Sequence, residues 1–196
     1  WSFLNTGADF GTVGGKGRYL VSEGLGKAYG AEFSFMKHFS NHYYILATAS
    51  YIRQFYKASD GIWRSGAFDN LYVFNILSGY EWVINPSFTM EFSFRYTLAG
   101  GRPYQPIDIE RSRQLGRTYI DDGTGFHERA EDYSRFDIRI DFRHNMQNIS
   151  VVSYVSIENL FNKDNFLNNI YDPGDNSIER ANQMGFFPVG GVRVEF

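Results

Sequence analysis

The stretch Phe88-Thr-Met-Glu-Phe-Ser-Phe-Arg-Tyr-Thr-Leu98 alternates apolar and polar side chains without a slip. Successive side chains of a strand point to opposite faces, so this period of two predicts a β-strand. The stretch Arg135-Phe-Asp-Ile-Arg-Ile-Asp-Phe-Arg143 repeats the pattern, and its second face is entirely ionic. Both stretches therefore predict strands that separate an apolar face from a charged one.

Weaker alternation continues along most of the chain, and helical periodicity does not extend far anywhere. We expect further strands at residues 28–39, 43–56, 67–82, 149–160 and 186–196, and residues 1–13 could supply one more. Regular spacing of strands and turns is typical of all-β folds. The pattern predicts one antiparallel meander over residues 1–196, without an internal domain boundary.

Composition excludes several classes of protein. The 196 residues contain no cysteine, which excludes disulfide scaffolds and thiolate metal sites. A formal net charge of −3 argues against a nucleic-acid partner. No run reaches the roughly 18 consecutive apolar residues of a transmembrane helix. A transmembrane strand stays compatible with the sequence, because only every second side chain of such a strand faces lipid.

The connections between the expected strands alternate between short and long. Tight turns are expected near Asn41, near Pro86 and at residues 145–148. The connections between them are long and rich in Gly, Asp, Asn and Arg, and they cover residues 14–27, 57–66, 100–132 and 161–183. Outer-membrane barrels have such a short-turn rim and a long-loop rim. Loops above about 15 residues are uncommon unless functional or disordered, so an external binding rim would account for them.

Alternation alone leaves two architectures open: a lipocalin-like barrel with its aromatic side chains inside, and a membrane barrel with them outside. The expected strands have the length of tilted transmembrane strands, about 10 to 12 residues. Aromatic residues such as Tyr43, Tyr80 and Trp82 gather near strand ends, where interfacial girdles lie. We therefore expect an antiparallel up-and-down transmembrane β-barrel, to which this chain contributes seven to eight strands.

Two segments are distinctive: Gly-Arg-Pro-Tyr-x-Pro-x-Asp from Gly101 and Glu-Asn-Leu-Phe-Asn from Glu158. Together with shorter segments at residues 26–33, 63–70, 133–139 and 191–196, they resemble the C-terminal part of a TonB-dependent outer-membrane receptor. Members of this family have a barrel of 22 strands around an N-terminal plug that carries the segment contacted by TonB.

The resemblance implies a bacterial outer-membrane location and gated uptake of a scarce or bulky nutrient, such as a siderophore, vitamin, glycan or peptide. It implies outer-membrane lipid, the protein's own plug, TonB and the solute as partners, and it implies neither a cofactor nor enzymatic activity. The chain shows no plug or TonB box, so we expect the C-terminal strands of a larger barrel. The alternatives are a free-standing eight-stranded outer-membrane protein with a structural or adhesive role and, from another class, a barrel hydrolase. The four histidines have no triad spacing, which argues against the hydrolase.

Two groups of residues are candidates for function. If the aromatic face meets lipid, the charged face lines the lumen with Glu91, Arg95, Asp137, Arg139 and Asp141. Mutual pairing of charges is the simpler interpretation of that set. The loop at residues 100–132 offers groups for gripping carboxylates or sugar rings, namely Arg102, Tyr104, Arg111, Arg113, Tyr119, Asp121 and Asp122. A solvated loop without a ligand is the alternative, and no spacing indicates a metal site.

The last strand ends in residues that resemble the family's terminal assembly signal: Gly191, Val192, Val194 and Phe196. An alternating strand with free N–H and C=O groups can add to an exposed strand of the barrel-assembly machinery. Membership of Phe196 in a periplasmic aromatic girdle explains the same residue equally well.

Overall fold

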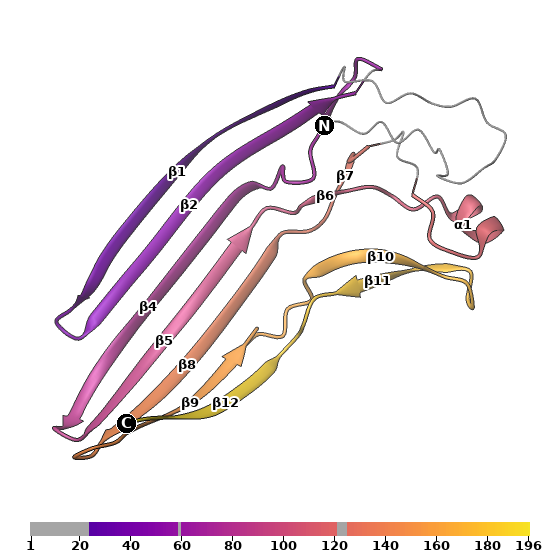
Figure 1. Ribbon diagram of the computed structural model, residues 1–196. Helices are drawn as coiled ribbons and strands as arrows, with labels where there is room; N and C mark the ends of the chain where they lie inside the picture. Colours follow the sequence, from indigo (N-terminus) through magenta and orange to yellow (C-terminus); the bar gives the residue numbers. More distant parts are fainter. Residues whose placement is uncertain (1–23, 59, 121–124) are drawn as a thin grey trace.

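The protein is described by a computed structural model that covers residues 24–58, 60–120 and 125–196. The long strands are β1 (Leu25–Ser40), β2 (Tyr43–Lys57), β4 (Leu71–Asn85), β5 (Phe88–Ala99), β8 (Tyr133–Asn145), β9 (Ser150–Glu158) and β12 (Phe187–Glu195). They form one antiparallel sheet in chain order, which β3 (Trp63–Ser65) extends by pairing with β2 (Figure 1). Strand makes up 67% of the structure and helix 4%, which confirms the all-β prediction.

The strands predicted from alternation are present, with shifted ends. The expected strand at residues 67–82 begins only at Leu71, because residues 66–70 form a turn in which the Asp69 amide donates to the Gly66 carbonyl at 3.1 Å. Leu71 itself has a φ of +67°, a conformation that starts the strand abruptly. The expected strand at residues 1–13 lies outside the described residues.

Two segments expected to be loops contain secondary structure. Residues 100–132 contain the short strands β6 (Pro103–Tyr104) and β7 (Glu128–Arg129) and the helix α1 (Ile109–Leu115). Residues 161–183 contain a hairpin of β10 (Phe166–Asp172) and β11 (Ser177–Asn182). Neither segment is therefore a loop throughout, as the sequence had suggested. Short elements of this kind leave too few residues for a period to be recognised.

The helix is fixed by its two ends. The Asp108 side chain accepts a hydrogen bond from the Arg111 amide at 3.0 Å, and Gly116 ends the helix with a φ of +63°. These are the usual N-cap and C-cap devices, and both were present in the sequence. The helix is too short to be stable alone, so its surroundings hold it in place.

The connections are sorted by length between the two ends of the sheet. Short turns join β1 to β2, β4 to β5 and β8 to β9 at one end, where the C-terminus also lies (Figure 1). The longer connections, with α1 and the β10–β11 hairpin, lie at the other end. We call these ends the short-turn rim and the long-loop rim. The predicted alternation of short and long connections is thus present among the described residues.

The sheet has two chemically distinct faces. The strand register places Phe92 beside Tyr80 and Ile140, and Glu91 beside Glu81 and Asp141. We call the first face the apolar face and the second the polar face. Every second residue belongs to the apolar face, and none of these residues is charged within residues 29–35, 43–51, 72–82, 88–98, 136–142, 151–157 and 188–194. Charges appear on this face only toward the rims.

The apolar face has no layer packed over it in the described part of the chain. Aromatic rings on it contact one another, as in the pairs Phe94–Phe136 at 5.8 Å and Phe136–Phe161 at 5.5 Å between ring centroids. The buried hydrophobic residues are few, namely Ala58, Val152 and Tyr171, whereas Phe33 is 67% exposed. In a water-soluble fold a second layer would cover such a face. No described helix is both long and apolar enough to cross a membrane.

Candidate functional site

Asp69 is a buried residue of the long-loop rim, and its carboxylate contacts several segments of the chain. Its side chain is fully buried, and its Oδ1 accepts hydrogen bonds from Arg53 Nε at 2.8 Å and from the Gln54 amide at 3.1 Å. Its Oδ2 accepts from Ser65 Oγ at 3.0 Å and from Arg129 Nη2 at 2.9 Å. One carboxylate therefore joins β2, β3 and β7 to the turn that precedes β4.

The surroundings of Asp69 keep it ionised. Burial by itself would raise the pKa of this carboxyl, but the hydrogen bonds from Arg53, the Gln54 amide and Ser65 lower it by more. The pKa of Asp69 thus lies below its usual value. A buried carboxylate held by two guanidinium groups is a rigid anchor for the loops around it.

Arg129 extends this anchor into the longest connection. Its Nη1 donates to the Asp69 carbonyl at 2.5 Å and to the Gly101 carbonyl at 2.6 Å. A Cβ atom at Gly101 would lie 1.6 Å from the Ala130 carbonyl oxygen, so only glycine fits where the two ends of this connection meet. The segment at residues 100–132 therefore leaves and re-enters the sheet through a fixed neck.

Asn159 is a buried polar residue that holds the base of the connection between β9 and β12. It is 1% exposed and has a φ of +50°, and its amide donates to Asp137 Oδ1 at 2.8 Å. Its Nδ2 donates to the carbonyls of Lys163 at 2.9 Å and Met184 at 3.2 Å. Asparagine tolerates this left-handed conformation better than most residues. The Glu-Asn-Leu-Phe-Asn segment thus ends β9 and fixes the base of the β10–β11 connection.

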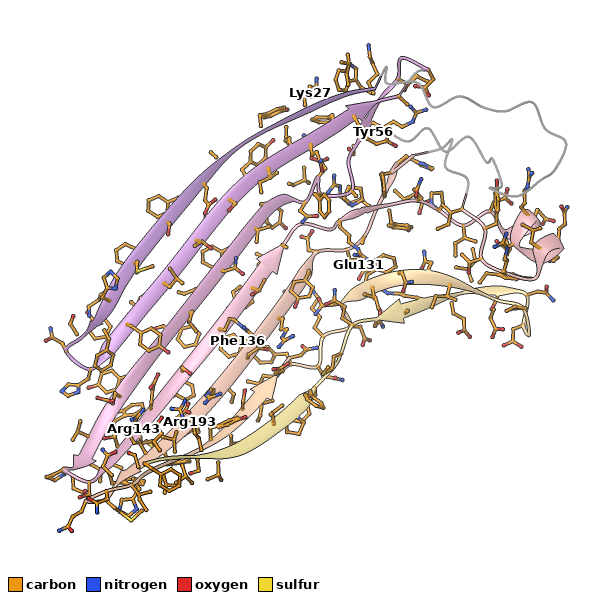
Figure 2. All side chains as sticks on the ribbon, viewed as in Figure 1. Lys27, Tyr56, Glu131, Phe136, Arg143 and Arg193 are labelled. Carbon is orange, nitrogen blue, oxygen red and sulfur yellow. The ribbon has the colours of Figure 1, made fainter. Side chains whose placement is uncertain are left out.

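Arg102 and Tyr104, two of the predicted solute contacts, hold the neighbouring hairpin. Arg102 Nη2 donates to the Leu167 carbonyl, and the Tyr104 ring lies 5.0 Å from the Phe166 ring, centroid to centroid. The Glu131 carboxylate, labelled in Figure 2, pairs with Arg180 of the hairpin at 3.2 Å. These contacts pack β10 and β11 against the longest connection, so Arg102 and Tyr104 act in the structure as positioning residues.

Arg111 and Arg113 belong to α1, and Tyr119 follows this helix; we call this part of the longest connection the tip. Arg111 and Arg113 are exposed on α1, and the Arg111 guanidinium lies 5.2 Å from the Tyr119 ring centroid. Arg113 makes an exposed pair with Glu110 at 3.3 Å. The predicted contacts Asp121 and Asp122 lie outside the described residues. Exposed guanidinium groups beside an aromatic ring can bind carboxylates, phosphates or sugar rings.

The five charges predicted for a lumen share the polar face and are mostly paired. Arg95 contacts Asp137 at 2.7 Å, and Arg139 contacts Asp141 at 2.5 Å. Glu91 accepts a hydrogen bond from the hydroxyl of Tyr44 at 3.1 Å. Glu91, Arg139 and Asp141 line a hollow of about 530 Å³ on this face, together with Tyr44, Arg143, Arg193 and their neighbours. Figure 2 shows Arg143 and Arg193 close to the short-turn rim.

Two tyrosines on the polar face lie across glycines of the adjacent strand. Tyr44 passes over Gly79 to reach Glu91 two strands away, and a Cβ at Gly79 would lie 2.6 Å from the tyrosine ring. Tyr154 lies over Gly191 of β12, where a Cβ would again come within 2.6 Å. The face of the Tyr154 ring also receives Arg139, whose guanidinium carbon lies 3.9 Å from the centroid. At both positions a side chain would have to displace the tyrosine ring, which occupies the space that a Cβ atom needs.

The neighbouring glycines of β12 allow a matched test of this arrangement. We expect Gly191→Ala to lower the free energy of unfolding of the full-length protein by about 1 to 3 kcal/mol, because the Tyr154 ring must leave its place. Gly190→Ala should have little effect, because its Cβ would meet nothing nearer than the Tyr154 carbonyl oxygen at 3.4 Å. Equilibrium unfolding in urea measures the free energy of unfolding of both variants. If Gly191→Ala loses no more than Gly190→Ala, the Tyr154 ring moves aside at little cost.

One group of carboxylates in the described ranges has the geometry of cation ligands. Oxygens of Asp172, Asp175 and Glu179 lie within 4.8 Å of one another at the turn of the β10–β11 hairpin. Asp172 Oδ1 already accepts a hydrogen bond from the Gly174 amide at 2.7 Å. Carboxylate oxygens are the ligands of hard cations such as Ca²⁺, but exposed acidic turns are common without one.

Comparison with known proteins does not add a functional assignment. No protein-family model matches the chain, and no curated protein or solved structure shows significant similarity to it. The site is therefore defined by its own chemistry: an anchored long-loop rim with an exposed basic tip, and a polar face with paired charges.

Proposed function

We propose that this chain is the C-terminal part of a TonB-dependent outer-membrane receptor that imports a scarce or bulky nutrient. The observation that carries the proposal is the uncharged, uncovered apolar face backed by a polar face of paired charges. A bilayer selects this arrangement in barrel strands, whose outward side chains meet lipid while their inward side chains meet water. In this proposal the polar face, with Glu91 and Arg139, lines the lumen.

The free edges of the sheet support a larger closed barrel. In the described residues β1 has only β2 as a partner along its length, and β12 has only β9. Backbone N–H and C=O groups at an open edge cannot be satisfied by lipid, and each unsatisfied group costs several kcal/mol. Closure of the sheet by further strands would satisfy these groups, and on the resemblance to receptors we propose that the same polypeptide supplies those strands.

The proposed mechanism assigns separate tasks to the two parts of the site. Arg111, Arg113 and Tyr119 present cationic and aromatic groups to a solute outside the cell, on a segment held by Asp69 and Arg129. The paired charges of the polar face provide a wet passage around a plug, and energy delivered through TonB displaces that plug. This division assigns no covalent chemistry to any residue of the chain.

The test uses the full-length protein in the bacterium that produces it. We expect the protein to co-fractionate with the outer membrane and to cross-link to TonB. Two deletion strains, one without its gene and one without TonB, are grown on a panel of siderophores, cobalamin, glycans and peptides. Both strains should fail to grow on the same limiting nutrient. Recovery in the inner membrane or the soluble fraction, or the absence of any TonB cross-link, would overturn the proposal.

A pair of variants links the tip to solute uptake. Arg111→Gln with Arg113→Gln should reduce uptake while leaving the amount of protein in the outer membrane unchanged. The control, Lys37→Gln, removes a positive charge near the short-turn rim and outside the polar face, and it should leave uptake unchanged. An equal effect per charge removed would indicate that net charge, and not the tip, determines uptake.

The terminal strand allows a prediction about assembly. The side chain of Phe196 is 98% exposed after the end of β12, whose outer edge has no partner among the described strands. Deleting Phe196 should slow outer-membrane assembly severalfold if the residue is a recognition signal, because edge addition would lose its aromatic anchor. Pulse-chase assembly of this variant is compared with Tyr43→Ala and Trp82→Ala. Equal assembly rates for all three would assign Phe196 to a girdle.

A further inference from the structure

We propose that a cationic aromatic corner at the long-loop rim binds the phosphate groups of a glycolipid in the outer leaflet. The corner consists of Lys27, Lys57 and Trp63, with Tyr29 and Phe55 beside them. The inference rests on the proposed function, because it places this rim at the outer surface of the membrane. Figure 2 shows Lys27 at the long-loop end of β1.

The strand register brings the corner together. Lys27 of β1 lies opposite Phe55 of β2, and Lys57 of β2 lies opposite Trp63 of β3. Lys27 Nζ is 4.4 Å from the Trp63 ring centroid and 5.4 Å from that of Phe55, and Lys57 Nζ is 5.8 Å from the Trp63 centroid. The Tyr29 ring stacks near Phe55 at 6.3 Å. Two ammonium groups are thus held near one indole ring.

These two lysines differ from the other cations nearby, because no carboxylate of the described residues pairs with them. Arg53 pairs with Asp69 at 2.8 Å, and Arg64 pairs with Asp60 at 2.6 Å. Lys27 and Lys57 make cation–π contacts only, in the parts of the chain that the structure covers. Their charge is therefore available to an external anion, while the rings beneath limit their movement.

The corner is placed at the depth where lipid headgroups would lie. It shares the apolar face with the uncharged band, and it lies at the end of that band. Tyr29 is 56% exposed and Trp63 is 42% exposed. Tyrosine and tryptophan side chains favour the membrane–water interface, and cations next to it attract anionic headgroups. A free anion would not need the exposed rings, whereas a phosphorylated lipid uses both rings and ammonium groups.

Lys37 provides an internal comparison on the same strand and face, at the opposite rim. Its Nζ donates to the Ser40 carbonyl at 2.8 Å, to Ser40 Oγ at 2.9 Å and to the Tyr43 carbonyl at 3.1 Å. All three donors of an ammonium group are thereby used within the protein. Among the described lysines of this face, the two without a hydrogen-bonded or ionic partner, Lys27 and Lys57, therefore lie at the long-loop rim, where a phosphorylated outer leaflet would be.

The experiment titrates fluorescent lipid A, a bisphosphorylated glycolipid, into phosphatidylcholine nanodiscs that hold the full-length protein. We expect Lys27→Gln with Lys57→Gln to raise the dissociation constant about thirtyfold, since each lysine near an anionic lipid surface contributes about 1 kcal/mol. Lys27→Arg with Lys57→Arg should retain binding, because arginine also pairs with phosphate. Lys37→Gln should leave the dissociation constant unchanged.

Each other outcome has a defined meaning. Unchanged binding by the double glutamine variant, or an equal loss with Lys37→Gln, would overturn the corner as the site. Full competition by inorganic phosphate at matched ionic strength would show a simple anion site and overturn the lipid assignment. A wild-type protein that fails to enter the bilayer would reject the proposed function and with it this inference. Insertion with equal affinity for all variants would reject the inference alone.

Discussion

Replacing Asp69 by alanine should lower the free energy of unfolding of the full-length protein by about 3 kcal/mol. The substitution removes the acceptor of five hydrogen bonds and leaves the guanidinium groups of Arg53 and Arg129 without their carboxylate. Both arginines are partly exposed, which keeps the expected loss at the lower end of the range for a broken buried pair. Urea unfolding of the protein in lipid vesicles measures the change. Limited proteolysis should show faster cleavage within residues 100–132, because their neck depends on Arg129.

Asp60→Ala is the matched control for this effect. Asp60 also pairs with an arginine, Arg64, at 2.6 Å, but it lies exposed at the same rim. Exposed pairs contribute little to stability because water screens them and their side chains are free to move. The control should therefore change neither the unfolding midpoint nor the cleavage rate appreciably. Equal losses from Asp60→Ala and Asp69→Ala would contradict the role of burial.

The stabilisation by Asp69 should depend on pH in a defined direction. The pKa of Asp69 is lower in the folded protein than its ordinary value. As pH falls, the unfolded chain therefore binds this proton first, and the contribution of Asp69 decreases through the acidic range below about pH 4. Above that pH the contribution is complete. The difference in unfolding free energy between wild type and Asp69→Ala should thus be constant near neutrality and shrink on acidification. A difference in unfolding free energy that grows on acidification would contradict the lowered pKa of Asp69.

The strands were predictable because each carries its own signal. The alternation of residues 88–98 and of residues 135–143 reflects two environments on the two faces, and such a period does not depend on contacts elsewhere. The pairing of Arg139 with Asp141 also follows from this period, since residues two positions apart on a strand share a face. Tight turns and long connections were visible from composition. The division of the sheet into apolar and polar faces was therefore available before the structure.

The site was less predictable because its contacts join distant parts of the chain. Asp69 meets Arg129 only because β7 returns to the neck at Gly101, and no local pattern marks that meeting. The end of α1 at Gly116 was a local signal, but seven residues show no clear period. Arg102 could be recognised as a loop residue, whereas its bond to the Leu167 carbonyl depends on where the hairpin packs. Lys27 and Trp63 likewise meet only through the register of three strands.

The proposal that the apolar face meets lipid leads to the second large prediction. Phe92→Arg should destabilise the full-length protein in lipid by about 2 to 4 kcal/mol, because the charge would lie near the middle of the bilayer. The neighbouring substitution Glu91→Arg places the same side chain on the polar face, between Glu81 and Asp141. It loses one hydrogen bond from Tyr44 and gains two carboxylate neighbours, so the expected change is much smaller.

Labelling decides between the two orientations without relying on stability. These 196 residues contain no cysteine, so a cysteine introduced at position 92 or 139 is the only one in this part of the protein. A lipid-phase probe should modify position 92, and a water-soluble thiol reagent should modify position 139. If the reagents exchange their targets and Glu91→Arg is the more damaging substitution, the aromatic side chains face inward as in a lipocalin. The lumen assigned to the paired charges and the headgroup contact assigned to Lys27 would then both be rejected, because each depends on lipid at the apolar face.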